Sequence, residues 1–169
     1  MSDYINEYEF RNQPKKITYF NADPLNLTKE LNFFHNKNKF RKELTRLQYL
    51  FRDYTGFSLI ASGIRDSFLK EEYTEKYLLV IFTDNEIIHK ANDMIEKNLD
   101  IEFQPGCYYL EANSEYLLLL SKDMKGLVAG VDKMEEIFTQ TFKHYFEQNN
   151  MNEFIKIRPF KLFDCVNEL

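Results

Sequence analysis

The sequence predicts an α+β fold in which a mixed β-sheet carries long helices packed mainly on one face. Stretches with the 3.6-residue period of an amphipathic helix are interspersed with short apolar runs typical of strands. Gly 5 and Pro 4 are both low, which favours long regular elements. Hydrophobic residues make up 44% and aromatic residues 16%, too apolar a composition for intrinsic disorder.

The chain divides into two segments of unequal size. Residues 1–13 are polar with scattered aromatics and predict an N-terminal arm. Residues 14–169 form one α+β domain, since a chain of 169 residues is the usual size of a single domain.

In the first half, residues 17–20 are β-branched or aromatic and predict a strand. From about residue 38 the apolar positions step by three or four, which predicts a helix that ends at Gly56. Its buried stripe is predicted to be Phe40, Leu44, Leu47, Phe51 and Tyr54. Residues 57–60 then predict a short strand.

In the second half, residues 77–82 form a continuous apolar run and predict a central strand. A helix should follow, capped by residues 83–85 and carrying apolar positions from Ile87 to Ile95. Residues 107–112 and 116–120 predict a hairpin across the turn at 113–115. A second long helix is predicted over about 122–146, and a last strand over 154–159 that Pro159 stops. The stripe of the second helix is predicted to be Leu127, Val131, Met134, Phe138, Phe142 and Tyr145.

Charge disfavours a nucleic-acid partner. Lys+Arg 22 against Asp+Glu 27 gives a net charge of −5, without the positive field that supplies non-specific affinity for phosphate backbones. One basic cluster could contact phosphate or an acidic partner, although a solvated helix face is the favoured interpretation. Its members are Lys37, Lys39, Arg41, Lys42 and Arg46, interleaved with Phe40 and Tyr49.

No catalytic, cofactor-binding or metal-binding residue is predicted. The chain has no glycine-rich phosphate loop and no nucleophile elbow. His35, His89 and His144 each stand alone, without the spacing of a zinc site. Two acidic pairs, residues 71–72 and 135–136, lack the apolar surroundings that prepare a carboxyl group for acid–base work.

Cys107 and Cys165 are predicted to be unpaired, half-buried small hydrophobes rather than a disulfide or zinc pair. The N-terminus has neither the basic nor the apolar region of a signal peptide. The longest apolar run, residues 117–120, is far shorter than the roughly 20 residues of a membrane helix. These features predict a cytoplasmic protein without a membrane partner.

Residues 106–138 resemble a known family. The pattern is similar to that of the small α+β domain before the catalytic barrel of β-N-acetylhexosaminidases (chitobiases). It consists of a Gly106-Cys-Tyr-Tyr-Leu strand, a second strand at 116–120, Asp123 and a Gly126-x-x-x-Gly130 step. The helix end at Thr55-Gly56 and residues 155–160, similar to the linker into the barrel, extend the likeness. The glycine pair would let the helix lie close to the sheet. The chain departs from the family pattern at residues 128–129 and 131–134.

The resemblance implies a zincin-like accessory-domain fold without a metal motif. It also implies a non-catalytic role, because the family's catalytic Asp-Glu pair belongs to the barrel and matches nothing here. The partner would be another protein or a carbohydrate-active catalytic domain.

Two other functions stay open. One is a protein-interaction or assembly module unrelated to carbohydrate, which would dock through aromatics near the two termini. These are Tyr4, Tyr8, Phe10, Phe160 and Phe163. The other is a small transferase whose site leaves no motif.

Overall fold

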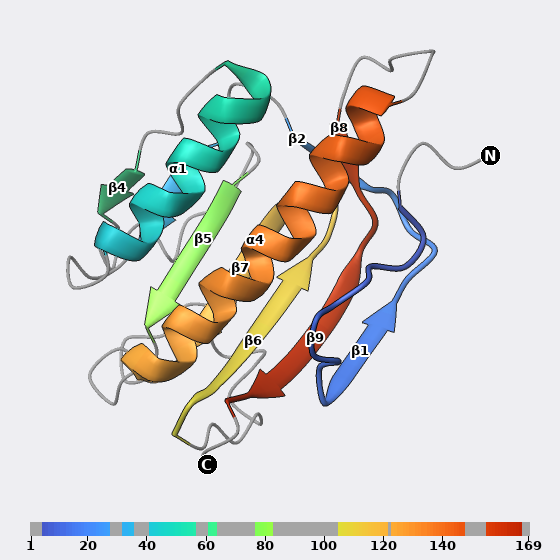
Figure 1. Ribbon diagram of the computed structural model, residues 1–169. Coiled ribbons are helices and arrows are strands. Elements are labelled where there is room, and N and C mark those ends of the chain that lie inside the picture. Colours follow the sequence, from blue (N-terminus) through green and yellow to red (C-terminus); the bar gives the residue numbers. More distant parts are fainter. Residues whose placement is uncertain are drawn as a thin grey trace.

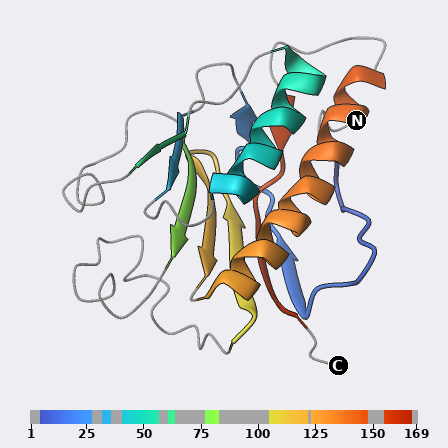
Figure 2. The same cartoon turned by 60° about the vertical axis from the view of Figure 1, so that its left-hand side comes forward.

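The computed structural model of the chain describes residues 5–27, 32–35, 41–56, 61–63, 77–82, 105–121, 123–147 and 155–166. Within these residues, two long helices lie over a seven-stranded sheet, and a separate two-stranded sheet shares the same hydrophobic core (Figure 1). A view turned by 60° shows both helices on the same side of the large sheet (Figure 2). The predicted α+β class and the helices on one face are confirmed.

The large sheet is mixed, in the order β1-β9-β6-β7-β5-β3-β4. Neighbours are antiparallel from β1 to β7 and parallel from β7 to β4. The strands are β1 (Lys16–Tyr19), β3 (Asn32–His35), β4 (Ala61–Gly63), β5 (Tyr77–Phe82), β6 (Cys107–Ala112), β7 (Tyr116–Ser121) and β9 (Phe160–Cys165). The interior position predicted for residues 77–82 is confirmed, since β5 lies between β7 and β3.

The predicted hairpin is β6 and β7. Asn113 shapes the turn: its side-chain oxygen accepts the backbone N–H groups of Glu115 and Tyr116, both at 2.9 Å. Short polar side chains that bond their own backbone in this way favour turns. Every residue of β7 is buried, as expected for a strand in the middle of the sheet.

Helix α1 (Arg41–Thr55) and helix α4 (Met124–Glu147) run parallel to each other. Phe51 packs edge-on against Phe138 with ring centroids 4.9 Å apart, and Tyr54 stacks on Phe142 at 5.3 Å. The predicted stripe of α4 is buried as far as Phe142, with Tyr145 partly buried. In α1, Leu47 and Phe51 are buried, and Gly56 at φ 83° closes the helix as predicted.

Two glycines let α4 lie close to the sheet. A Cβ atom at Gly126 would collide with the backbone carbonyl of Cys107, and one at Gly130 would lie 2.5 Å from a Leu119 methyl carbon. The sequence prediction for this pair is therefore confirmed. Asp123 caps the same end, accepting the N–H of Gly126 at 2.8 Å and of Gly106 at 2.9 Å.

The C-terminal strands differ from the prediction. The strand predicted at 154–159 is present and ends before Pro159, but it is not the last strand, because a further strand follows the proline in the other sheet. β8 (Ile155–Ile157) pairs with β2 (Leu25–Leu27), whereas β9 pairs with β1 and β6. Because proline has no N–H group, it suits the point where the chain leaves one ladder for another. Four strands, β2, β3, β4 and β9, were not predicted from the sequence.

Two predicted elements lie outside the described residues. They are the short strand at 57–60 and the helix that was expected to follow residues 83–85. No helix in the described part of the chain is long and apolar enough to cross a membrane.

Candidate functional site

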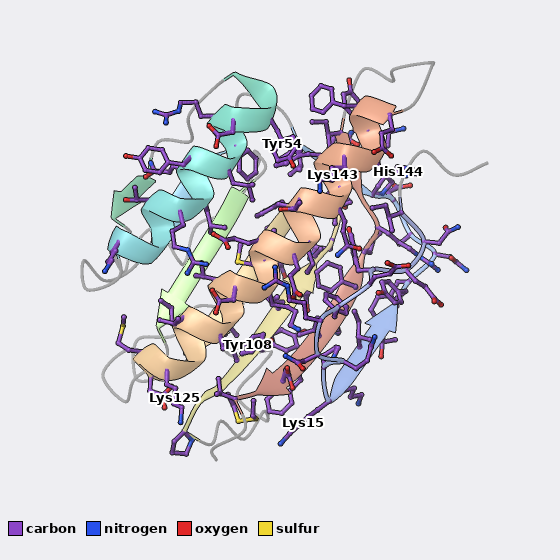
Figure 3. All side chains as sticks on the ribbon, in the orientation of Figure 1. Lys15, Tyr54, Tyr108, Lys125, Lys143 and His144 are labelled. Carbon is purple, nitrogen blue, oxygen red and sulfur yellow. A yellow bond between two sulfur atoms is a disulfide. The ribbon has the colours of Figure 1, made fainter. Side chains whose placement is uncertain are left out.

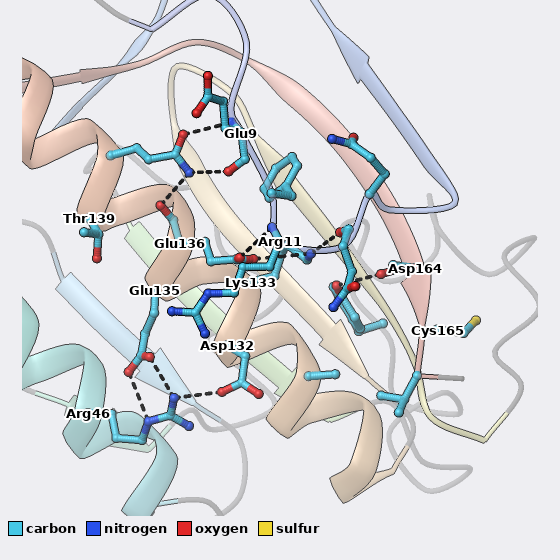
Figure 4. Close-up of a pocket in the computed structure, with 17 residues that line it drawn as sticks. Glu9, Arg11, Arg46, Asp132, Lys133, Glu135, Glu136, Thr139, Asp164 and Cys165 are labelled. Atoms are coloured by element: carbon cyan, nitrogen blue, oxygen red, sulfur yellow. Dashed lines mark hydrogen bonds and ion pairs between the residues drawn. The ribbon is translucent and has the colours of Figure 1, made fainter. Parts of the chain in front are cut away.

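The described part of the chain contains an open groove of about 1040 Å³ between the N-terminal arm, α4 and the ends of β6 and β9 (Figure 4). Residues 9–13 of the arm form one wall, and one face of α4 forms another. Its lining is rich in charged side chains of both signs, namely Glu9, Arg11, Arg46, Asp132, Lys133, Glu135, Glu136 and Asp164.

At the rim facing α1, Arg46 joins the two helices. Its guanidinium donates to Glu135 at 2.7 and 3.0 Å and to Asp132 at 2.7 Å. The hydrogen bonds that Arg46 donates to Asp132 and Glu135 raise the pKa of its guanidinium group. The fork of the guanidinium matches the Glu135 carboxylate, so this two-point contact links α1 to α4.

Deeper in the groove, Lys133 is a buried cation with a side chain only 8% exposed. Its ammonium group donates to the Asn12 carbonyl at 2.9 Å, forms an ion pair with Glu136 at 3.3 Å, and lies 4.7 Å from the centre of the Phe10 ring. A buried charge needs such partners to offset its desolvation. Lys133 therefore ties the arm to α4.

The base of the groove is Tyr108, which lies beneath α4 (Figure 3). Its hydroxyl group donates to Asp164 at 3.4 Å, and Asp164 also accepts the backbone N–H of Lys15 at 3.2 Å. Burial, together with the charge of Asp164, raises the pKa of Tyr108. The phenol therefore stays protonated and acts as a hydrogen-bond donor.

Of the residues singled out in the sequence, the structure brings several together here. Glu135 and Glu136 both line the groove, where Glu135 contacts Arg46 and Glu136 contacts the arm. Arg46, from the basic cluster, contacts acids of its own chain, and Lys42 is exposed. The other members lie outside the described residues, namely Lys37, Lys39, Phe40, the side chain of Arg41 and the acidic pair at 71–72.

Among the residues that the structure describes, no histidine lines the groove. His144 lies in the last turn of α4, the side chain of His35 in β3 is not described, and His89 lies outside the described residues. Among the described residues, no three His, Cys, Asp or Glu side chains come together in a way that could hold a metal ion.

The prediction that the cysteines are unpaired is wrong. Cys107 and Cys165 form a disulfide between β6 and β9, and the two residues stand directly opposite each other in the strand register. The two cysteines are 58 residues apart in the sequence, so no local spacing indicates that they pair. The pairing depends on β9, a strand that the sequence analysis did not include.

The aromatics expected to form an exposed docking surface are largely internal. Tyr8 is 6% exposed, Phe160 is fully buried, and Phe10 packs against the core. Phe163 is half-buried, and Tyr4 lies outside the described residues. That surface prediction is wrong for Tyr8 and Phe160, because β9 and the arm carry them into the core.

A second polar cluster, which the sequence analysis missed, surrounds Glu111 on the sheet face away from α4. The Glu111 carboxylate accepts the hydroxyl groups of Tyr109 at 2.7 Å and Tyr116 at 2.8 Å, and the Asn113 amide at 3.2 Å. Lys161 approaches it to 3.9 Å. Burial and the Glu111 charge raise the pKa of Tyr116. The sequence did contain a signal for this cluster: Glu111 is an acid within an otherwise apolar strand, and a buried charge requires partners.

Comparison of the fold with solved structures finds glycoside hydrolases. CpGH84D matches with a TM-score of 0.65 and 15% identity, over 95% of this chain and 24% of that chain. The GH20 β-N-acetylhexosaminidase from Streptomyces coelicolor A3(2) matches with a TM-score of 0.57 and 12% identity, over 89% and 25%. CpGH84B matches with a TM-score of 0.56 and 14% identity, over 94% and 22%.

These likenesses concern the fold. The chain spans about a quarter of the length of the enzymes it matches, so it resembles one domain of each. No protein-family model and no curated protein matches the sequence. The resemblance to hexosaminidase domains that the hairpin and the glycine pair predicted is confirmed at the level of the fold.

Proposed function

We propose that this chain is a non-catalytic accessory domain of the hexosaminidase type, which acts by assembling with a carbohydrate-active catalytic domain. The observation that supports this is the uneven coverage of the match: at least 89% of this chain corresponds to at most 25% of each enzyme. A domain that recurs as a minor part of larger enzymes suits a supporting role.

The chemistry of the groove supports the same proposal. Glycoside hydrolysis commonly uses two carboxyl groups flanking the scissile bond, one to donate a proton and one to act as nucleophile or base. Here Asp132 and Glu135 share Arg46, and Glu136 accepts the backbone N–H of Arg11 at 3.1 Å. Each of these three carboxylates is thus hydrogen-bonded to a group of the same chain.

Turnover assays test the non-catalytic part of the proposal. The purified chain is incubated with chitin oligosaccharides and with an aryl N-acetyl-β-glucosaminide, and product release is followed by chromatography and absorbance. We expect no release above a buffer control. Release that Glu135→Gln or Glu136→Gln abolishes, and that Glu147→Gln on the exposed end of α4 leaves unchanged, would refute the proposal.

A second candidate is an assembly module that is independent of carbohydrate. It is favoured by the way α4 holds the N-terminal arm, largely through the backbone of residues 9–12. Titration of the chain with chitin oligosaccharides separates this candidate from a sugar-binding role. Saturable binding of the oligosaccharide would count against it.

The proposed compartment depends on the two cysteines. The cytoplasm was expected when they were interpreted as unpaired, but disulfides are rare in the cytosol of most organisms. The Cys107–Cys165 bond therefore supports an oxidising compartment instead. Mass spectrometry of protein isolated under denaturing, alkylating conditions decides, because it counts the alkylated cysteines: none supports the oxidising compartment, and two support the cytoplasm.

A further inference from the structure

Little of the N-terminal arm, residues 5–13, is buried. The arm contains no helix or strand, and Tyr8 is its single buried residue. Ile5 and Phe10 are partly buried, and the other residues of the arm are exposed. A segment with so few buried apolar contacts opens at a lower free energy than the core of a domain.

The arm is held on α4 by hydrogen bonds that lie at the surface. Glu9 pairs with Gln140, donating its N–H at 2.9 Å and accepting the side-chain amide on its carbonyl at 2.7 Å. Arg11 donates its N–H to Glu136 at 3.1 Å (Figure 4). These contacts are exposed to solvent, so water competes for each of the groups and their net stabilisation is small.

Tyr8 anchors the arm in the core. Its ring lies 6.0 to 6.3 Å, centroid to centroid, from the rings of Phe10, Tyr19 and Phe160. Its hydroxyl group lies 3.4 Å from the Thr141 hydroxyl, and its N–H donates to the Tyr19 hydroxyl at 2.9 Å. Because the other contacts of the arm are at the surface, its docked state depends mainly on this side chain.

A short hinge joins the arm to the domain. Lys15 belongs to the domain, since Asp164 accepts its N–H at 3.2 Å and β1 begins at the next residue. Asn12 is the last residue of the arm that α4 holds. Between them, Gln13 and Pro14 make no hydrogen bond within the described part of the chain. The arm can therefore swing about residues 13–14 without disturbing β1.

Undocking of the arm would change the surroundings of Lys133 most. The arm supplies the Asn12 carbonyl at 2.9 Å and the Phe10 ring at 4.7 Å, whereas Glu136 belongs to α4 itself. Without the arm, the ammonium group of Lys133 regains water and the arm regains backbone freedom. Both gains offset part of the lost contacts and lower the cost of opening.

We propose that the arm is a strap that opens as one unit about residues 13–14 while the rest of the domain stays folded. Opening uncovers Lys133 and removes one wall of the groove, because residues 9–13 form that wall. Lys133 is thus an amine that reagents and partners reach only in the open state. The inference concerns the arm of this chain and does not depend on the accessory-domain proposal.

Amide hydrogen exchange of the full-length chain, followed by NMR, tests whether the arm opens as a unit. We expect the N–H groups of Glu9 and Arg11 to share one protection factor, at least about a hundredfold below that of Leu119 in the central strand β7. Equal protection of the arm and β7 would overturn the proposal, because the arm would then open only when the domain unfolds. Protection factors of Glu9 and Arg11 that differ more than about tenfold would also overturn it, since the arm would then fray residue by residue.

Acetylation with an N-hydroxysuccinimide ester, read by mass spectrometry, tests the exposure of Lys133. The exposed Lys161 is the internal standard for the rate. Tyr8→Ala should raise the rate at Lys133 at least about thirtyfold, the factor by which truncation of an aromatic hot spot weakens an interface.

A second variant covers the case in which Tyr8→Ala destabilises the whole domain. Gln140→Ala removes the pair with Glu9 and keeps a good helix former, and it should raise acetylation of Lys133 about threefold to tenfold. Lys143→Ala, at an exposed position one turn further along α4, is the matched control and should leave the rate unchanged. Acetylation of Lys133 that stays at the parent rate in Gln140→Ala, or that rises equally in Lys143→Ala, would overturn the strap.

Discussion

Gly126 in α4 allows the helix to lie against β6, and replacing it with alanine tests that reading of the packing. The added Cβ would meet the Cys107 carbonyl group at a separation that real Cβ atoms do not reach, and the Ser121 hydroxyl oxygen at 2.9 Å. The Cys107 carbonyl belongs to the backbone of a disulfide-linked strand, so it cannot rotate away. The helix end would have to lift from the sheet.

The magnitude follows from two opposed effects. Alanine gains at most about 1 kcal/mol over glycine in helix propensity. Overpacking costs about 1–3 kcal/mol, and we expect the upper end because the obstacle is main chain. Gly126→Ala should therefore lower the free energy of unfolding by about 2 kcal/mol, which for a chain of this size corresponds to a fall in Tm of roughly 4–8 °C.

Urea denaturation followed by far-ultraviolet circular dichroism measures this change. Gly130→Ala is the matched comparison, because its Cβ would meet side-chain atoms of Leu119 and Tyr108, which can adjust. We expect a loss of at most about 1 kcal/mol there. A Gly126→Ala variant that is more stable than the parent chain, as alanine is at an exposed helical site, would refute the close-packing argument.

Three further outcomes are expected. Reduction of the Cys107–Cys165 bond, or a Cys107→Ser/Cys165→Ser variant, should lower the free energy of unfolding by roughly 4 kcal/mol, which is the loop-closure value for a separation of 58 residues. Urea titrations measure this loss, and unchanged stability would contradict the prediction. Asp123→Ala should cost about 1 kcal/mol by removing the cap that holds Gly126, with Asp123→Asn closer to the parent chain, and equal losses in both would point to charge instead. Burial raises the pKa of Tyr8 above its ordinary value near 10, so above that pH the folded state keeps a proton that the unfolded state releases. The contribution of Tyr8 to the free energy of unfolding should therefore be constant below about pH 10 and then fall by about 1.4 kcal/mol per pH unit. Urea titrations of the parent chain and of Tyr8→Phe at each pH measure this, and the fall should be shallower in Tyr8→Phe.

The sequence alone predicted the elements whose pattern is local. Helix α4 and the β6–β7 hairpin follow from apolar spacing and from the turn at Asn113, and both are present. β2 and β3 are only three and four residues long, too short for a periodic pattern. β9 does alternate buried Phe160 and Leu162 with exposed Lys161, but Pro159 was interpreted as a stop.

The site was less predictable because it depends on contacts between distant parts of the chain. Glu135 and Glu136 were noticed as a pair, yet their partners Arg46 and Arg11 are 89 and 125 residues away. The arm was expected to be polar, but Tyr8 and Phe10 carry it onto the core. Likewise, the disulfide needs the β6–β9 register, which no spacing along the chain encodes.

The position of β9 between β1 and β6 has a consequence for how the protein is made. β1 pairs with the rest of the large sheet only through a strand that leaves the ribosome almost 150 residues later, so it must wait unpaired until that strand has been made. Pairings this remote in sequence also slow the search for the native state. Closure of this edge of the sheet should be a late event, following formation of the hairpin and α4.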